Sequence, residues 1–144
     1  MKIGHGLLQW SDALATGIDQ IDHQHMMLIN ILNEANLRFQ HQEDKASLEK
    51  VIGDLVSYTV YHFDTEEELM EESAFGEKSP DEEIRHIREH RSFAAQVGQY
   101  QAAIRQGEAV DHAILFTFLN NWLINHVQGT DMTLGRHLHA HQAR

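Results

Sequence analysis

Apolar residues recur along this chain at steps of three and four, the spacing that places them on one face of an α-helix. Four long segments follow this pattern, at about residues 19–39, 44–74, 80–106 and 111–128. No segment alternates apolar and polar residues as a half-buried β-strand does. Because the connections between the segments are short, the pattern predicts an all-α protein, an antiparallel up-down-up-down four-helix bundle.

The order of the segments also predicts how the chain is organised. Its 144 residues suit a single domain, residues 1–144, with one sizeable core. We place an N-terminal arm at residues 1–17 and the bundle at residues 18–128. A polar tail at residues 129–144 can hold a short last helix. We expect Gly76 to stop the second helix of the bundle, as glycine often does.

Each of the four inward faces carries at least one histidine. The residues concerned are His25 on the first face, His62 with Glu66 on the second, His86 with His90 on the third, and His126 on the fourth. At a rise of roughly 1.5 Å per residue, antiparallel packing brings all of them into one layer at one end of the bundle. The chain has 12 histidines, so about one His pair at i,i+4 arises by chance. The shared layer is the stronger signal.

The run HFDTEEELMEE (residues 62–72) combines this inward pair with an acidic surface. His62 and Glu66 lie one helical turn apart on the apolar face. The other glutamates are expected to face largely outward, as solvated surface: Glu67, Glu68, Glu71 and Glu72. We also expect the tail histidines to be solvated and not to form a metal patch: His137, His139 and His141.

Charge and composition narrow the possible functions. The formal net charge of -11 repels phosphate backbones and anionic lipids, so neither nucleic acid nor a membrane surface is an expected partner. The absence of cysteine excludes disulfides, thiolate metal sites and cysteine nucleophiles. No secretory leader opens the sequence and no apolar stretch approaches the roughly 20 residues needed to span a bilayer. We therefore expect a cytoplasmic protein.

A layer of imidazoles and a carboxylate inside a bundle is costly unless its polar atoms find partners. Metal coordination satisfies them together, and imidazole with carboxylate suits iron, zinc, copper or nickel. Five histidines and one or two acids exceed what one tetrahedral zinc needs, so the layer indicates two metal ions.

Four stretches in this chain resemble the hemerythrin family, in family order and over nearly the whole sequence: TGIDQIDHQH, HFDTEEELM, HIREH and WLINHVQGTD. The resemblance implies seven metal ligands: His25, His62, Glu66, His86, His90, His126 and Asp131. Asp131 is placed by the resemblance alone. It follows His126 by five residues, about 140° round an ideal α-helix, so the backbone must loosen or tighten between them. Gly129 makes such a change plausible.

The resemblance also implies what the ligands hold: two iron ions per chain, cycling between Fe2+ and Fe3+ and joined by an oxo or hydroxo bridge. Glu66 and Asp131 would each bridge both ions. Three histidines would complete one ion: His86, His90 and His126. The other two, His25 and His62, would serve an ion with one open position, which takes dioxygen or, in the oxidised form, a small anion such as azide.

The resemblance predicts reversible dioxygen binding for storage, delivery or sensing, and not an enzyme. Mostly neutral ligands and a single open position favour binding over oxidation chemistry. Trp122 and Leu123 lie one turn before His126 and are expected to wall the oxygen pocket. Two alternatives stay open: a di-iron oxidase, peroxidase or nitric oxide reductase on the same site, and an iron buffer. An oxygen-consuming protein is a possible partner.

Overall fold

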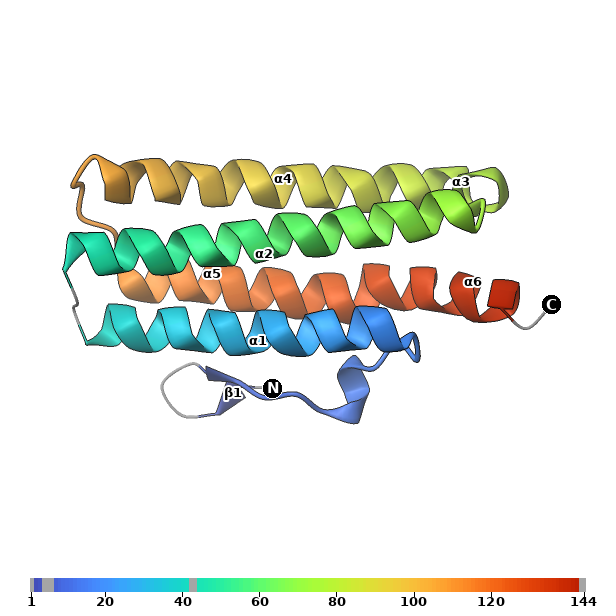
Figure 1. The fold of residues 1–144 in the computed structure, drawn as a ribbon, viewed down its shortest axis with the longest axis horizontal. Helices are drawn as coiled ribbons and strands as arrows, with labels where there is room; N and C mark the ends of the chain where they lie inside the picture. The colour runs from blue at the N-terminus through green and yellow to red at the C-terminus, as the bar shows by residue number, and fades with distance from the viewer. Residues whose placement is uncertain (1, 4–6, 42–43, 143–144) are drawn as a thin grey trace.

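The computed structural model describes residues 2–3, 7–41 and 44–142 of the chain (Figure 1). Its main helices are α1 (Asp19–Gln40), α2 (Lys45–Glu72), the short α3 (Phe75–Lys78), α4 (Pro80–Arg105), α5 (His112–Asn125) and α6 (Met132–Gln142). A π-helix, η2 (His126–Asp131), joins the last two without a break, so that α5, η2 and α6 form one rod.

The four long rods pack as the predicted up-down-up-down bundle. Helix α1 contacts α2 and α5, and α2 contacts α4. Figure 1 shows the end of α1, the start of α2 and the α4–α5 connection at one end of the bundle, and α3 at the other. The all-α fold predicted from the apolar spacing is therefore confirmed.

The N-terminal arm lies along α1 (Figure 1). It contains a two-stranded antiparallel pair, β1 (Lys2–Ile3) with β2 (Leu7–Leu8), and a 3-10 turn, η1 (Asp12–Leu14). The Asn33 side chain of α1 anchors the arm, because its Oδ1 accepts from the Leu8 amide at 2.9 Å and its Nδ2 donates to the Leu8 carbonyl at 2.8 Å.

Local sequence sets the ends of the helices. Asp44 and Asp111 are N-caps whose carboxylates accept from the amides of Ser47 and Ile114. Gly107, at φ 79°, follows the end of α4. The expected stop at Gly76 was wrong: α2 ends at Glu72, the left-handed residue is Ala74 at φ 57°, and Gly76 lies within α3.

Two apolar clusters lie on either side of a buried polar layer. The larger cluster fills the bundle toward the α1–α2 connection and includes Leu28, Leu32 and Leu55. The smaller is built from Ile18, Ile21, Met70, Phe75, Leu134 and Leu138. On α1, His25 stands between Ile21 of one cluster and Leu28 of the other, so the histidine layer is enclosed by apolar side chains.

The C-terminal segment is more ordered than a polar tail. It is helical as α6, and Leu134 and Leu138 are buried in the smaller cluster. His137, expected in a solvated tail, is half-buried, and its Nε2 lies 2.9 Å from the Ser73 carbonyl. Among the described residues, no helix combines the length and the apolar character needed to cross a membrane.

Candidate metal centre

The π-helix η2 brings His126 and Asp131 to the same side of their rod. Residues five apart point about 140° away from each other on an α-helix, but the i→i+5 hydrogen bonds of a π-helix place them one turn apart. Both side chains accordingly face the interior, where His126 is 3 % exposed and Asp131 is fully buried. A Cβ added at Gly129 would meet nothing within 4 Å, so the wider turn does not depend on glycine there.

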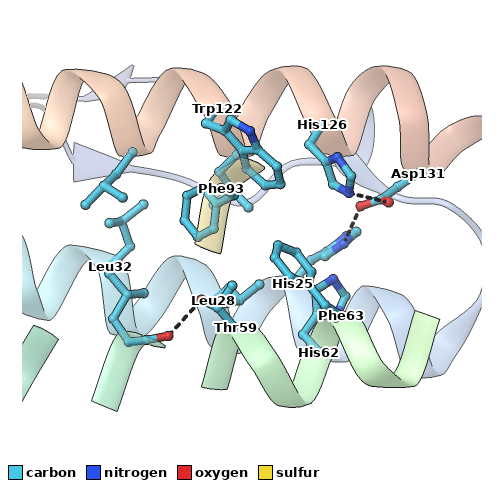
Figure 2. Close-up of a pocket in the computed structure, with 13 residues that line it drawn as sticks. His25, Leu28, Leu32, Thr59, His62, Phe63, Phe93, Trp122, His126 and Asp131 are labelled. Atoms are coloured by element: carbon cyan, nitrogen blue, oxygen red, sulfur yellow. Dashed lines mark hydrogen bonds and ion pairs between the residues drawn. The ribbon is translucent and has the colours of Figure 1, made fainter. Parts of the chain in front are cut away.

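The seven predicted ligands converge in one buried layer, each at most 3 % exposed: His25, His62, Glu66, His86, His90, His126 and Asp131. Figure 2 shows four of them, from α1, α2 and η2, directed toward one another. They form two groups whose potential ligand atoms lie within 4.8 Å of one another. The first group is Glu66, His86, His90 and His126, and the second is His25, His62, Glu66 and Asp131.

Glu66 belongs to both groups because its two oxygens face different histidines. Its Oε1 lies 3.0 Å from His90 Nε2 and 3.1 Å from His86 Nε2. Its Oε2 lies 3.2 Å from His62 Nε2 and 3.6 Å from His25 Nε2. The carboxylate therefore stands between the two groups with one oxygen toward each.

The two oxygens of Asp131 also face different histidine groups. Its Oδ2 is 2.8 Å from His25 Nε2, whereas its Oδ1 is 3.1 Å from both His86 Nε2 and His126 Nε2. Two buried carboxylates thus each direct one oxygen to each of two histidine groups. This is the arrangement that two carboxylates bridging a pair of ions require.

The carboxylates and histidines of the layer shift one another's pKa values. Burial alone would lower the pKa of His25, but Asp131 and Glu66 outweigh it and raise that pKa to about 9. The same balance raises the pKa of His126 well above its usual range. Burial alone would raise the pKa of Glu66 and of Asp131, but the surrounding histidines hold both well below their ordinary values.

Most of the inward-facing ligand atoms of the layer have no hydrogen-bond partner within the described part of the chain. These buried atoms are the Nε2 atoms of His25, His62 and His126, Oε2 of Glu66 and both oxygens of Asp131. An unpaired buried polar atom costs roughly 1–3 kcal/mol. Ions in the two groups would satisfy these atoms together, and imidazole nitrogen with carboxylate oxygen suits divalent transition metals. The residues present therefore fit a pair of metal ions.

Three hydrogen-bond partners outside the layer orient the ligating histidines, and sequence reasoning missed all three. The pairs are His62 Nδ1 with Gln24 Oε1 at 2.7 Å, His90 Nδ1 with Glu67 Oε2 at 2.9 Å, and His126 Nδ1 with Glu89 Oε1 at 2.7 Å. An Nδ1–H donated outward leaves the Nε2 lone pair facing the layer. Glu67 was expected on the solvated surface. It is instead 21 % exposed, because it reaches back to His90.

A signal for these partners exists in the sequence but is weak. Gln24, Glu67 and Glu89 each stand next to a ligand on their own helix, and each reaches a histidine of another element. Adjacency to a ligand could have nominated them. It would not have separated Glu89 from Arg91, which flanks His90 on its other side and is exposed.

A small apolar cavity borders the second group (Figure 2). Its volume is about 20 Å³, which is room for about one water-sized molecule. The ligands that line it are His25, His62, Asp131 and His126, and the rest of its wall includes Leu28, Leu32, Thr59, Trp122 and Leu123. The Thr59 hydroxyl is turned back to the Leu55 carbonyl at 2.7 Å, which leaves the wall of the cavity largely apolar apart from the ligands.

The structure places Trp122 and Leu123 on this wall, as the sequence suggested, although their contact with a ligand stays a prediction. The half-buried Trp122 ring stacks on the His126 ring, with centroids 4.5 Å apart and planes 15° apart. Leu123 is 8 % exposed. It also borders a second apolar space beneath the N-terminal arm, which Trp10, Leu14 and His25 help to line.

Comparison with known proteins gives consistent results. The family model described as "Hemerythrin HHE cation binding domain" matches residues 16–138. A bacteriohemerythrin of Stenotrophomonas maltophilia (strain R551-3) is 37% identical, over 94% of this chain and 84% of that protein. A bacteriohemerythrin of Pseudomonas aeruginosa (strain LESB58) is 34% identical, over 86% of this chain and 76% of that protein.

More distant relatives share the architecture. A myohemerythrin of Riftia pachyptila is 29% identical, over 85% of this chain and 86% of that protein. A crystal structure of wild-type hemerythrin superposes with a TM-score of 0.81, covering 92% of this chain and 98% of that one at 24% identity, which speaks for the fold alone. With a family model spanning most of its length and relatives above 30% identity, the chain belongs to the hemerythrin family.

Proposed function

We propose that this protein binds dioxygen reversibly at a pair of iron ions held in the buried layer. The proposed ligands are His25, His62, Glu66, His86, His90, His126 and Asp131. The observation that carries the proposal is the position of two carboxylates between the two histidine groups. Glu66 and Asp131 each direct one oxygen to each histidine group, so both can bridge.

When bound, a pair of iron ions would supply the two electrons that dioxygen takes up on binding and returns on leaving. The chain supplies the surroundings. Its ligands are mostly neutral imidazoles, which offer less support for highly oxidised iron than a carboxylate-rich set would. Gln24, Glu67 and Glu89 hold three of these imidazoles with their Nε2 lone pairs inward.

The cavity supports a diatomic ligand on the side of His25 and His62. A space of about 20 Å³ takes about one small molecule, and its apolar wall admits a neutral gas more readily than water. A small anion such as azide is expected at the same place in the oxidised form. Trp122 and Leu123 form part of this wall, and we expect them to exclude water.

The same cavity favours a binding protein over an enzyme. Apart from the ligands, its lining within the described residues presents no carboxylate, lysine or free hydroxyl to move a proton, because Thr59 donates to Leu55. Dioxygen is therefore expected to be released chemically unchanged. The physiological role as store, carrier or sensor, an oxygen-consuming partner and a cytoplasmic location stay predictions from the sequence.

Metal analysis together with the visible spectrum tests the proposal. We expect about two irons per chain in protein from iron-replete cells. The reduced protein should gain a visible band in air and lose it on degassing. One zinc per chain, or a band that never reverses, would contradict the assignment.

A further inference from the structure

The side chains that accept hydrogen bonds from the histidines outside the metal layer differ in charge between the two groups. On the side of the first group, His90 Nδ1 donates to Glu67 and His126 Nδ1 donates to Glu89, so both partners are carboxylates. The Nδ1 of His86, the third histidine of this group, is buried without a hydrogen bond within the described residues. The Thr130 hydroxyl holds Glu89 by donating to the same Oε1 at 2.7 Å.

On the side of the second group, the only such partner in the described part of the chain is a neutral amide, that of Gln24. The Thr65 hydroxyl donates to the Tyr61 carbonyl at 3.1 Å, so Thr65 Oγ1 is left to accept from Gln24 Nε2 at 3.2 Å. This fixes the amide with Oε1 toward His62, 2.7 Å from its Nδ1. Gln24 therefore orients His62 through a short hydrogen bond, but without adding charge.

His25, the remaining histidine of the second group, has no outward partner at all within the described residues. Its Nδ1 is buried without a hydrogen bond. It borders the apolar space beneath the arm, whose other lining residues are Trp10, Leu14, Ile29, Leu123, Ile124 and Val127. The second group thus combines one amide-supported imidazole with one unsupported imidazole.

A carboxylate that accepts from Nδ1–H makes the imidazole a stronger donor at Nε2, and an amide does so less. Resting on the proposed two-ion function, we infer that the two metal positions differ in strength. The position held by His86, His90 and His126 binds first and more tightly, and Gln24 keeps the position held by His25 and His62 the weaker of the two. Gln24 is a positioning residue that acts through His62, and its neutrality sets the affinity of the side that borders the cavity.

Calorimetric titration of the metal-free protein with Co2+, an air-stable ion that accepts imidazole and carboxylate, tests this inference. The wild-type protein should bind two ions in two steps. Gln24→Glu should strengthen the weaker step by ~10-fold, the lower end of the effect of such outer partners. The Thr65 hydroxyl can turn to donate to the new carboxylate. Gln24→Leu, which leaves His62 unoriented, should weaken the same step.

The opposite signs of the two Gln24 variants exclude a merely structural role, because a damaged fold would weaken binding in both. Gln20→Glu is the matched control: it adds the same charge to α1 one turn away, at an exposed position, and should leave both steps unchanged. Glu89→Gln should weaken the tighter step by ~10-fold, and exposed Glu68→Gln should not.

Two binding steps of equal affinity in the wild-type protein, or a second step of lower affinity in Gln24→Glu than in the wild type, would overturn the inference. Neither result would contradict the two-ion centre. Binding of a single ion per wild-type chain would instead contradict the proposed function.

Discussion

Leu123 should protect bound dioxygen from water, and a pair of variants measures this protection. Leu123 borders both the cavity beside the second group and the apolar space beneath the arm. Shortening it to alanine or serine should join the two spaces. The cavity alone, about 20 Å³, already has room for about one water-sized molecule, so the joined space should admit water beside a bound ligand. Leu123→Ala enlarges the space alone, whereas Leu123→Ser also adds a hydroxyl.

The cost in stability can be bounded from burial. Leu123 is 8 % exposed, and truncating a leucine at such a position lowers the free energy of unfolding by about 2–5 kcal/mol. A domain of ordinary stability, about 5–15 kcal/mol, stays folded under that loss, and bound metal adds to its stability. No ligand is touched, so iron content should be normal.

The chemical effect should be larger in the serine variant. Dioxygen that has taken two electrons leaves irreversibly once it is protonated, and a hydroxyl or water nearby supplies the proton and solvates the departing anion. A hydrogen bond to a charged group contributes about 1.5–3 kcal/mol. Lowering the barrier by only about 1.4 kcal/mol makes the decay tenfold faster. We therefore expect at least roughly tenfold faster autoxidation in Leu123→Ser and a smaller increase in Leu123→Ala.

Stopped-flow oxygenation, followed by slow decay of the visible band, measures both rates. Ile114→Ser on the same helix is the matched control, because Ile114 is 62 % exposed and lies away from the cavity. Decay at the wild-type rate in both Leu123 variants, with iron content intact, would show that Leu123 does not guard the site.

Three further predictions concern the layer and its backbone. Asp131→Ala should lose iron and lower the melting temperature far more than His137→Ala, because Asp131 contacts both histidine groups; equal iron content in the two variants would refute its bridging role. Gly129→Ala should retain metal and stabilise the protein by about 0.5–1 kcal/mol, since the added Cβ meets nothing within 4 Å; loss of iron would mean that the π-turn needs glycine. The raised pKa values of His25, to about 9, and of His126 stabilise the metal-free fold below pH 6.5, and this contribution is lost as pH rises toward 9. The free energy of unfolding of the metal-free protein, measured by thermal melts, should therefore fall by on the order of 3 kcal/mol across that window from His25 alone. Metal-loaded protein should not follow, because its ligands bind no proton; parallel curves would refute the coupling.

Helical periodicity predicted most of the buried layer because most of its residues obey it. His62 and Glu66 stand one turn apart on the inward stripe of α2, and both are buried as that spacing predicts. The shared level of the histidines followed from antiparallel packing alone. Asp131 could not be found in this way, because its inward position depends on the i→i+5 hydrogen bonds of η2, which apolar spacing does not encode.

The outer hydrogen bonds were missed for a different reason. Glu67 and Glu68 are adjacent, identical in chemistry and equally plausible as surface acids. What separates them is the roughly 100° of rotation between adjacent residues of an α-helix, which turns Glu67 toward His90 on another helix. Such a contact depends on the packing of α2 against α4, which the sequence of either helix alone does not specify. The half-buried state of His137 similarly depends on how α6 meets the end of α2.

Oxygen uptake by the fully reduced, iron-loaded protein tests the central claim most directly. A closed cell with an oxygen electrode measures the oxygen consumed on adding protein and the oxygen recovered on displacement or degassing. The proposed centre, with two ions and one small cavity, predicts uptake of about one dioxygen per chain, nearly complete recovery, and no further consumption in the presence of excess reductant. Continued consumption under reductant, or uptake without recovery, would contradict reversible binding and identify the centre as an oxidase.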